Sequence, residues 1–111
     1  MKGLITLNRL DIIKNALLSV SPNVYHYTAG ETPNPPFVVW AEDSQNIFHS
    51  NNGHGETADQ GTVDLYTRYE IDPLRQAIPA ALAAIGCSWY KNSTQYEQDT
   101  GLIHDEWVFE V

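Results

Sequence analysis

The sequence is poor in cysteine, in basic residues and in long apolar runs, and each shortage excludes a class of protein. Cys87 is the only cysteine, so no disulfide can form within the chain, and a reducing compartment fits best. The 6 Lys and Arg are outnumbered by 14 Asp and Glu, and the formal net charge of -8 argues against electrostatic binding to nucleic acid or to an anionic membrane. The same acidity is compatible with DNA that passes along the protein without specific binding.

No stretch approaches the roughly 18 consecutive apolar residues that a membrane span needs. Near the N-terminus, Asn8, Arg9 and Asp11 interrupt the apolar run that a signal peptide would require. We therefore expect a protein that is made and kept in a cytoplasm, with no membrane partner.

Motifs that carry chemistry are also scarce. The chain has no Gly-rich phosphate loop, no Cys pair, no His-Glu helical motif and no Ser nucleophile elbow. Cys87 follows Gly86 and has no basic neighbour in the sequence, so we interpret it as a small core residue and not as a reactive thiol. His49 and His54 lie in a segment rich in Asn and Gly, which offers metal ligands no rigid support. We expect no catalytic residue, no cofactor and no metal site.

Two segments have the pattern of helices. Apolar residues recur every three or four positions over residues 7–20, which predicts an amphipathic helix. A second helix is expected after Asp72 and Pro73, which suit the N-cap and the first helical position, and Gly86 should follow its end. Pro79 lies inside this second helix and predicts a kink or a local break there.

Five further segments have the composition of strands. Hydrophobic residues make up 42% of the 111 positions, which is enough for one hydrophobic core. The expected strands are residues 24–28, 37–42, 61–69, 87–96 and 103–111. The order of helix, two strands, loop, strand, helix and two strands predicts an α+β fold. We expect a single domain over residues 1–111, with an antiparallel or mixed sheet of about four to five strands and two helices packed on one face.

Residues 43–60 are expected to form the longest irregular segment, because turn-forming residues gather at its middle. A loop of this length is usually functional or disordered. We interpret it as a loop that orders against a partner, or as a hairpin with a mobile tip. The candidate partner-contact residues are Gln45, Asn46, His49, Asn51, Asn52 and His54.

Aromatic residues outside this segment are candidates for contact between subunits. Tyr66, Trp89 and Tyr90 are proposed because aromatic side chains are enriched at the centres of protein interfaces. Each of them suits an ordinary core position equally well.

The closing hairpin contains the best acid–base candidates of the chain. Acidic residues Glu97, Asp99, Asp105 and Glu106 surround His104 in the sequence. If Glu97 and Glu106 face each other across strands, desolvation would raise one carboxyl pKa and create an acid–base pair. We favour a solvated outer face of an edge hairpin, which has the same composition.

The closing strand also carries a core pattern, because Trp107, Phe109 and Val111 alternate with polar residues and should pack against the helices.

Two rival functions stay open: a small acid–base or metal-dependent hydrolase that uses His104, Glu97 and Glu106, and a small-ligand binding module with an apolar pocket.

Three segments resemble, in their order and spacing, the small tail-completion or tail-terminator proteins of long-tailed bacteriophages and prophages. They are PFVVW at 36–40, VDLYTRYEIDPL at 63–74 and YEQDTGLIHDEWVFEV at 96–111. In the last of these, the family pattern of acidic residues, Asp-Thr-Gly, an aliphatic pair and His falls on Glu97, Asp99, Thr100, Gly101, Leu102, Ile103 and His104.

This resemblance implies a structural, non-enzymatic α+β subunit of a ring, typically a hexamer, that caps the finished tail tube and offers a docking surface to the head. Its partners would be further copies of the chain, the tail-tube protein and the head-completion protein. It would be located in the virion tail after synthesis in the host bacterial cytoplasm. A neighbouring head–tail neck component is the alternative.

Overall fold

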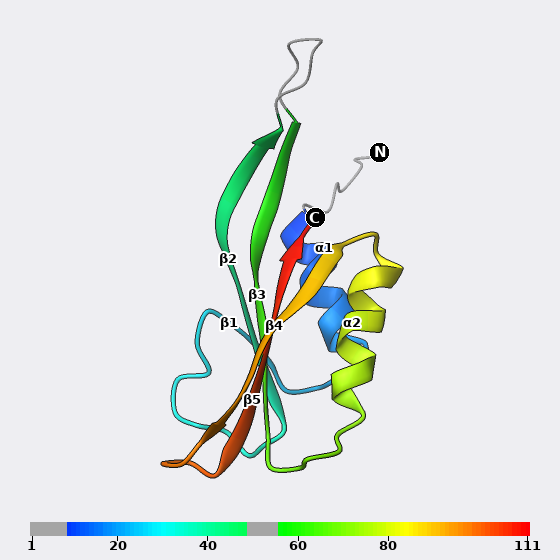
Figure 1. The fold of residues 1–111 in the computed structure, drawn as a ribbon. Helices are drawn as coiled ribbons and strands as arrows, with labels where there is room; N and C mark the ends of the chain where they lie inside the picture. Colours follow the sequence, from blue (N-terminus) through cyan, green and yellow to red (C-terminus); the bar gives the residue numbers. More distant parts are fainter. Residues whose placement is uncertain (1–8, 49–55) are drawn as a thin grey trace.

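The computed structural model describes residues 9–48 and 56–111. Two helices and five strands follow one another along this part of the chain (Figure 1). In order they are α1 (Arg9–Leu18), β1 (Val24–His26), β2 (Phe37–Phe48), β3 (Glu56–Thr67), α2 (Leu74–Ala84), β4 (Ser88–Glu97) and β5 (Leu102–Glu110).

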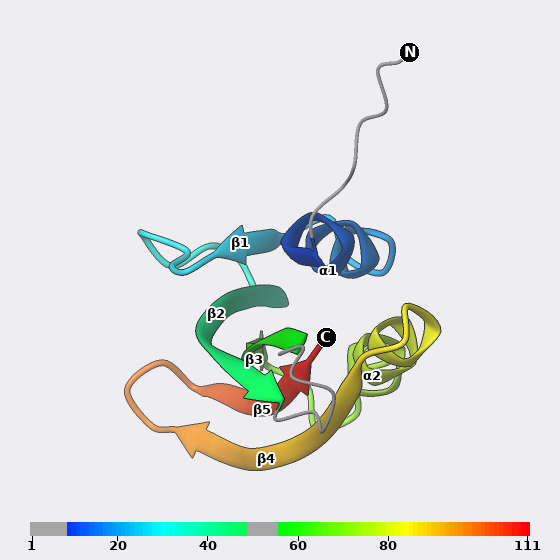
Figure 2. The ribbon, with the colours of Figure 1, turned by 90° about the horizontal axis from the view of Figure 1, so that it is seen from above.

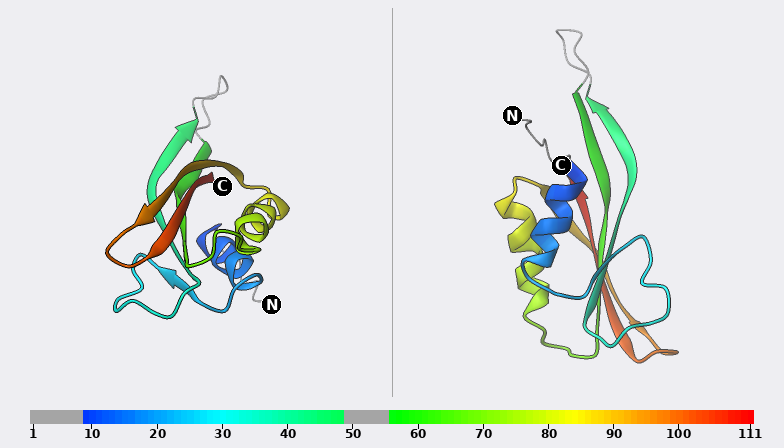
Figure 3. Two further views of the ribbon diagram at one scale, coloured as in Figure 1. Left: turned by 60° about the horizontal axis from the view of Figure 1, so that its bottom comes forward. Right: turned by 180° about the vertical axis from the view of Figure 1, so that it is seen from behind.

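The strands form one mixed sheet in the order β1-β2-β3-β5-β4. β1 runs parallel to β2, and the other neighbouring pairs are antiparallel. Both helices lie against the same face of the sheet, as the views from above and from behind show (Figure 2, Figure 3). The predicted α+β fold is therefore confirmed. We call the face under the helices the inner face and the opposite one the outer face.

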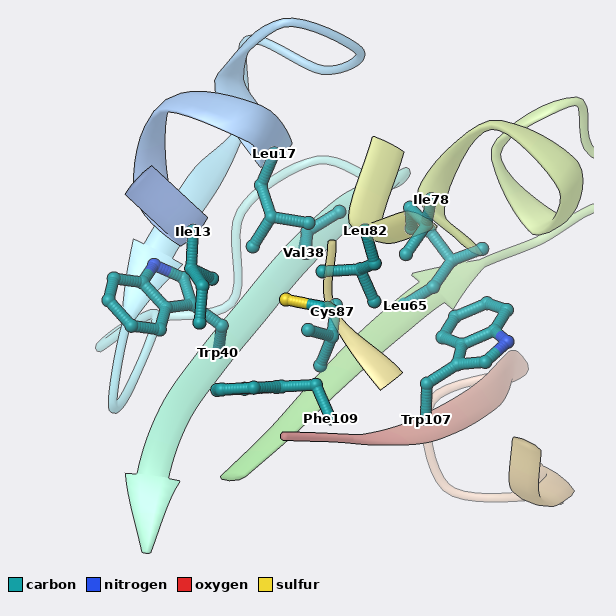
Figure 4. Close-up of a cluster of buried hydrophobic side chains, with 11 residues drawn as sticks. Ile13, Leu17, Val38, Trp40, Leu65, Ile78, Leu82, Cys87, Trp107 and Phe109 are labelled. Atoms are coloured by element: carbon teal, nitrogen blue, oxygen red, sulfur yellow. The ribbon is translucent and has the colours of Figure 1, made fainter. Parts of the chain in front are cut away.

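The core lies between the helices and the inner face (Figure 4). Alternate residues of β2, β3 and β5 point into it, and each helix adds an apolar stripe. Its buried members are Ile13, Leu17, Val38, Trp40, Val63, Leu65, Ile78, Leu82, Cys87, Trp107 and Phe109. The predicted packing of Trp107 and Phe109 is confirmed. Cys87 is a core residue, as predicted, and burial raises the pKa of its thiol to about 11.

The start of α2 follows the prediction, but Pro79 does not break the helix. Pro73 has helical backbone angles (φ -56°, ψ -24°), and the Leu74 N–H donates a 2.9 Å hydrogen bond to Asp72 Oδ1, so Asp72 caps the helix. Gly86, with φ 82°, follows the helix end as expected. The helix is continuous over Leu74–Ala84, so a local break at Pro79 is wrong, and the alternative of a kink there stays a prediction.

The largest difference from the predictions concerns residues 43–60. β2 continues to Phe48 and β3 begins at Glu56, and these two residues pair with each other in antiparallel register. The prediction of one long irregular segment is therefore wrong, and the hairpin that was its alternative is present. Gln45 and Asn46 are strand residues. The other proposed contact residues, His49, Asn51, Asn52 and His54, lie outside the described residues.

This hairpin projects beyond the rest of the sheet (Figure 1). β1 pairs no further along β2 than Trp40, and the last backbone contacts of β3 with the C-terminal end join Asp59 and Val111. Residues 46–48 and 56–58, here called the arm, therefore have only each other as strand partners within the described chain. An isolated two-stranded ribbon is marginally stable in water.

Two other strands end earlier than expected. β1 stops at His26 because Tyr27 has φ 72°, which is not an extended conformation. β3 stops at Thr67, and Tyr69 is exposed instead of lying on the buried face.

Candidate functional site

The outer face of the sheet presents acidic and aromatic side chains. Asp64 and Tyr66 on β3 lie directly opposite Glu106 and His104 on β5. The only Lys or Arg in the described strands is Lys91, which points to the inner face and forms an ion pair with the buried Asp105. No Lys or Arg in a described strand therefore balances the carboxylates of the outer face.

Three rings stack across the middle of this face. Tyr66 lies between Phe37 on β2 and His104 on β5, with ring centroids 4.8 and 4.3 Å apart and interplanar angles of 15° and 18°. Burial, with nearby carboxylates, raises the pKa of Tyr66 to about 12. Tyr66 is thus a half-buried member of a stack and not a freely exposed aromatic.

His104 lies between two carboxylates. Its Nε2 is 2.6 Å from Asp64 Oδ1, and its Nδ1 is 3.4 Å from Glu97 Oε2. The hydrogen bond to Asp64 raises the pKa of His104, against the opposing effect of burial. Because both ring nitrogens face carboxylates, the imidazolium form fits this environment, and no ring nitrogen is left to act as a general base. This arrangement supports an ion-pair role for His104 over the acid–base role considered from the sequence.

Glu106 completes the cluster, but not in the predicted way. Burial raises its pKa, and the Asp64 carboxylate adds to the effect, although Asn92 Nδ2 donates a 2.8 Å hydrogen bond to Glu106 Oε1. The hypothesised facing pair of Glu97 and Glu106 is wrong, because Glu97 lies opposite Leu102. Sequence reasoning missed Asp64, which lies on β3, 40 residues before His104 in the chain.

Asp105 does not belong to this cluster, since it points to the inner face. Its side chain is 0% exposed and lies 2.7 Å from Arg75 Nε, from Lys91 Nζ and from the Thr94 hydroxyl. Burial would raise the pKa of Asp105, but the hydrogen bonds from Lys91, Thr94 and Arg75 lower it below its usual range. Asp105 therefore connects α2, through Arg75, with β4, through Lys91 and Thr94.

Asp99, the remaining acidic candidate, lies in the exposed turn of the closing hairpin.

The other two proposed interface aromatics lie on β4, an edge strand of the sheet. Trp89 points to the inner side and is 41% exposed, whereas Tyr90 points to the outer side and is 57% exposed. The structure thus places Tyr66 and Tyr90 on one face and Trp89 on the other. Trp89 and Tyr90 both border an edge whose backbone has no further strand partner in the described chain.

Two shallow hollows border the outer face. One, of about 250 Å³, lies at the β4 edge and is lined by Trp89, Tyr90 and Val108 among others. The other, of about 260 Å³, lies beside the ring stack and includes Tyr27 and Tyr66. Both are smaller than the ~300–1,000 Å³ of common small-ligand pockets, so they give the binding-module hypothesis little support.

The fold is similar to that of a virion protein. A chain of the virion of a native gene transfer agent particle aligns with a TM-score of 0.52 and 10% sequence identity, covering 88% of this chain and 81% of that chain. At this identity, the likeness shows a shared fold. No protein-family model matches the sequence, and no curated protein is significantly similar to it. Neither described helix is long and apolar enough to cross a membrane.

Proposed function

We propose that this chain is a structural, non-enzymatic component of a phage-like virion and, more specifically, a tail-terminator or tail-completion subunit. The observation that carries the proposal is the fold shared with a chain of a gene transfer agent virion, which extends over 88% of this chain. The resemblance of three sequence segments to tail-completion proteins supports the same class. In this role the subunits form a ring, with six copies as the expected number, that caps the tail tube and joins it to the head.

Self-association would use the β4 edge. An edge strand offers unpaired N–H and C=O groups to a neighbouring chain. β4 has ten residues, and two of them, Trp89 and Tyr90, have exposed rings. Aromatic side chains of this kind are typical of interface centres, so a neighbouring subunit seated on this edge would bury them.

The arm would supply the contact with the tail-tube protein. It projects past the strands that flank β2 and β3, and its two strands pair only with each other. A ribbon of this kind gains order when a partner covers it. The head-completion protein would then bind on the opposite side of the ring.

The outer face suits the wall of a channel through which DNA passes. Asp64, Glu97 and Glu106 place carboxylates on it, and the described strands add no Lys or Arg there. Phosphates are repelled by such a surface, so DNA would pass without specific binding. A head–tail neck component would meet the same requirement and is the alternative to a tail terminator.

Shortening the arm tests the proposal. Asn46 and Ala58 are paired, so residues 47–57 can be replaced by Asn-Gly, which closes a two-residue hairpin at that register. We expect the variant to keep its thermal midpoint and to fail in joining tails to heads, scored as the fraction of joined particles in electron micrographs. Asp99→Asn in the exposed turn is the control that should join normally.

Two results would count against this assignment. Normal joining by the shortened variant would remove the arm from the tail contact, and loss of folding would show that the arm is part of the fold instead of a partner surface. Joining to isolated heads without any binding to tail tubes would favour the neck component.

A further inference from the structure

The outer-face cluster contains the donor set of a metal site. Asp64, His104 and Glu106 each offer one ligand atom, and these atoms lie within 4.8 Å of one another. We propose that Asp64, His104 and Glu106 bind a divalent transition-metal ion of the zinc type on the outer face. This inference does not depend on the ring or on its partners.

The donor chemistry favours this class of ion. One imidazole nitrogen with two carboxylate oxygens is a borderline-soft, mixed set that suits Zn²⁺ better than the all-oxygen sets preferred by Mg²⁺ and Ca²⁺. Three protein ligands leave the remaining coordination position to water or to a group from a partner.

The three ligands lie on two adjacent central strands of the sheet, so the backbone fixes their relative positions. Asp64 and Glu106 are directly opposite each other on neighbouring central strands, and His104 is two residues from Glu106 on the same side of β5. The inner-face residues between them, Leu65 and Asp105, are fully buried. The site therefore has the rigid support that the Asn/Gly-rich segment near His49 was expected to lack.

Admitting an ion requires the ligand atoms, which lie within 4.8 Å of one another, to adjust their spacing. Zinc bonds of about 2.0–2.2 Å place tetrahedral ligand atoms about 3.4 Å apart. His104 Nε2 and Asp64 Oδ1 are 2.6 Å apart, so they must separate by somewhat less than an ångström. Rotation of the two side chains can supply this movement, and the ion would take the place of the proton on His104 Nε2, which is released to solvent.

A second layer of groups already orients the ligands. Glu97 Oε2 lies 3.4 Å from His104 Nδ1, so it can accept the Nδ1 proton and direct Nε2 toward the ion. Asn92 holds Glu106 Oε1 at 2.8 Å, which leaves the other carboxylate oxygen for the ion. A divalent charge would also compensate three neighbouring carboxylates that no Lys or Arg of the described strands approaches on this face.

His26 provides a matched comparison within the same protein. Its Nε2 lies 2.7 Å from Glu42 Oε1, and its ring stacks on Trp40. It has one carboxylate partner where His104 has two nearby, and it belongs to no three-ligand group among the described residues. His26→Gln therefore controls for the loss of a histidine that is paired with an acid.

The test is isothermal titration of the full chain with zinc chloride. His49→Gln and His54→Gln are introduced into every sample, so that His26 and His104 are the remaining histidines. We expect one zinc ion per chain, at least tenfold weaker binding in Asp64→Asn and in His104→Gln, and unchanged binding in His26→Gln. Glu97→Gln should weaken binding by about 10–100-fold, the effect usual for a group that orients a metal-bound histidine.

Thermal unfolding with zinc and with a chelator provides a second measurement. Zinc should raise the midpoint of the background protein and of His26→Gln, but not that of Asp64→Asn. If Asp64→Asn does not fold, Glu106→Gln takes its place. The proposal is overturned if zinc gives no binding heat in the background protein, or if the substituted cluster binds zinc as tightly as the intact one.

Discussion

Replacement of Asp105 should measure how much a fully buried carboxylate with two cationic partners contributes to stability. Its carboxylate is 0% exposed and lies 2.7 Å from both Arg75 Nε and Lys91 Nζ. Asp105→Asn keeps the shape of the side chain but removes its charge, so two cations lose their shared partner.

The expected loss follows from how well those cations are solvated afterwards. Removal of one partner of a fully buried ion pair costs about 3–5 kcal/mol. Here Arg75 and Lys91 are 18% and 38% exposed, and Arg75 keeps hydrogen bonds to the carbonyl oxygens of Tyr69 and Glu70. Water and these carbonyls compensate part of the loss, so we expect the free energy of unfolding at neutral pH to fall by about 2–4 kcal/mol.

Urea denaturation at two pH values measures this effect. The folded-state pKa of Asp105 is lowered, so its contribution is fully present above the unfolded pKa of about 3.9 and is lost as the pH falls through the lower folded value. The difference between the wild type and Asp105→Asn should therefore shrink below about pH 4. Asp99→Asn, in the exposed turn, should change the stability by no more than about 0.5 kcal/mol.

The reasoning would be refuted by a loss under about 1 kcal/mol at neutral pH. A loss that stays constant on acidification would also refute it, because a charge-dependent contribution must disappear when the carboxylate is protonated.

Three further predictions concern single positions. A Cβ at Gly61 would overlap the Ala41 carbonyl oxygen and lie 2.8 Å from the Phe109 ring. Gly61→Ala should therefore lower the free energy of unfolding, measured by urea denaturation, by about 3 kcal/mol. An unchanged denaturation midpoint would contradict the close approach of β2 and β3. His104→Gln in metal-free buffer should cost about 1 kcal/mol below the unfolded pKa of about 6.5. Because the folded-state pKa of His104 is raised, this loss of stability should decline as the pH rises through the folded-state pKa. A loss that grows toward alkaline pH would show that the pKa of His104 is lowered in the folded state and not raised. Tyr90→Lys should leave stability within about 0.5 kcal/mol and weaken self-association in size-exclusion chromatography, whereas unchanged association would remove β4 from the interface.

The sequence was sufficient where local chemistry decides the structure. Asp72 and Pro73 mark the start of α2 through capping and a fixed backbone angle, and Gly101, with φ 72°, allows the turn of the closing hairpin. The alternation that ends in Trp107 and Phe109 identified the buried face of β5, because a half-buried strand has a period of two.

Features that depend on strand order were beyond the sequence. Asp64 could be placed on the polar side of its strand, but only the adjacency of β3 and β5 brings it to His104. The alternation of β5 places Asp105 on the same side as Trp107, but its partners Arg75 and Lys91 come from other elements, so the buried ion pairs could not be identified from the sequence. From the sequence, the hairpin that contains the arm was only an alternative to an irregular loop, because residues 43–60 show no clear hydrophobic period and backbone pairing between β2 and β3 is what makes the hairpin.

The most direct test of the proposed function is negative-stain electron microscopy of the full chain mixed with purified tail tubes, with native mass spectrometry of the protein alone. The proposal predicts closed rings, expected to contain six copies of the 12.5 kDa chain, seated at the ends of the tubes. A protein that stays monomeric at high concentration and leaves the tube ends bare would contradict it.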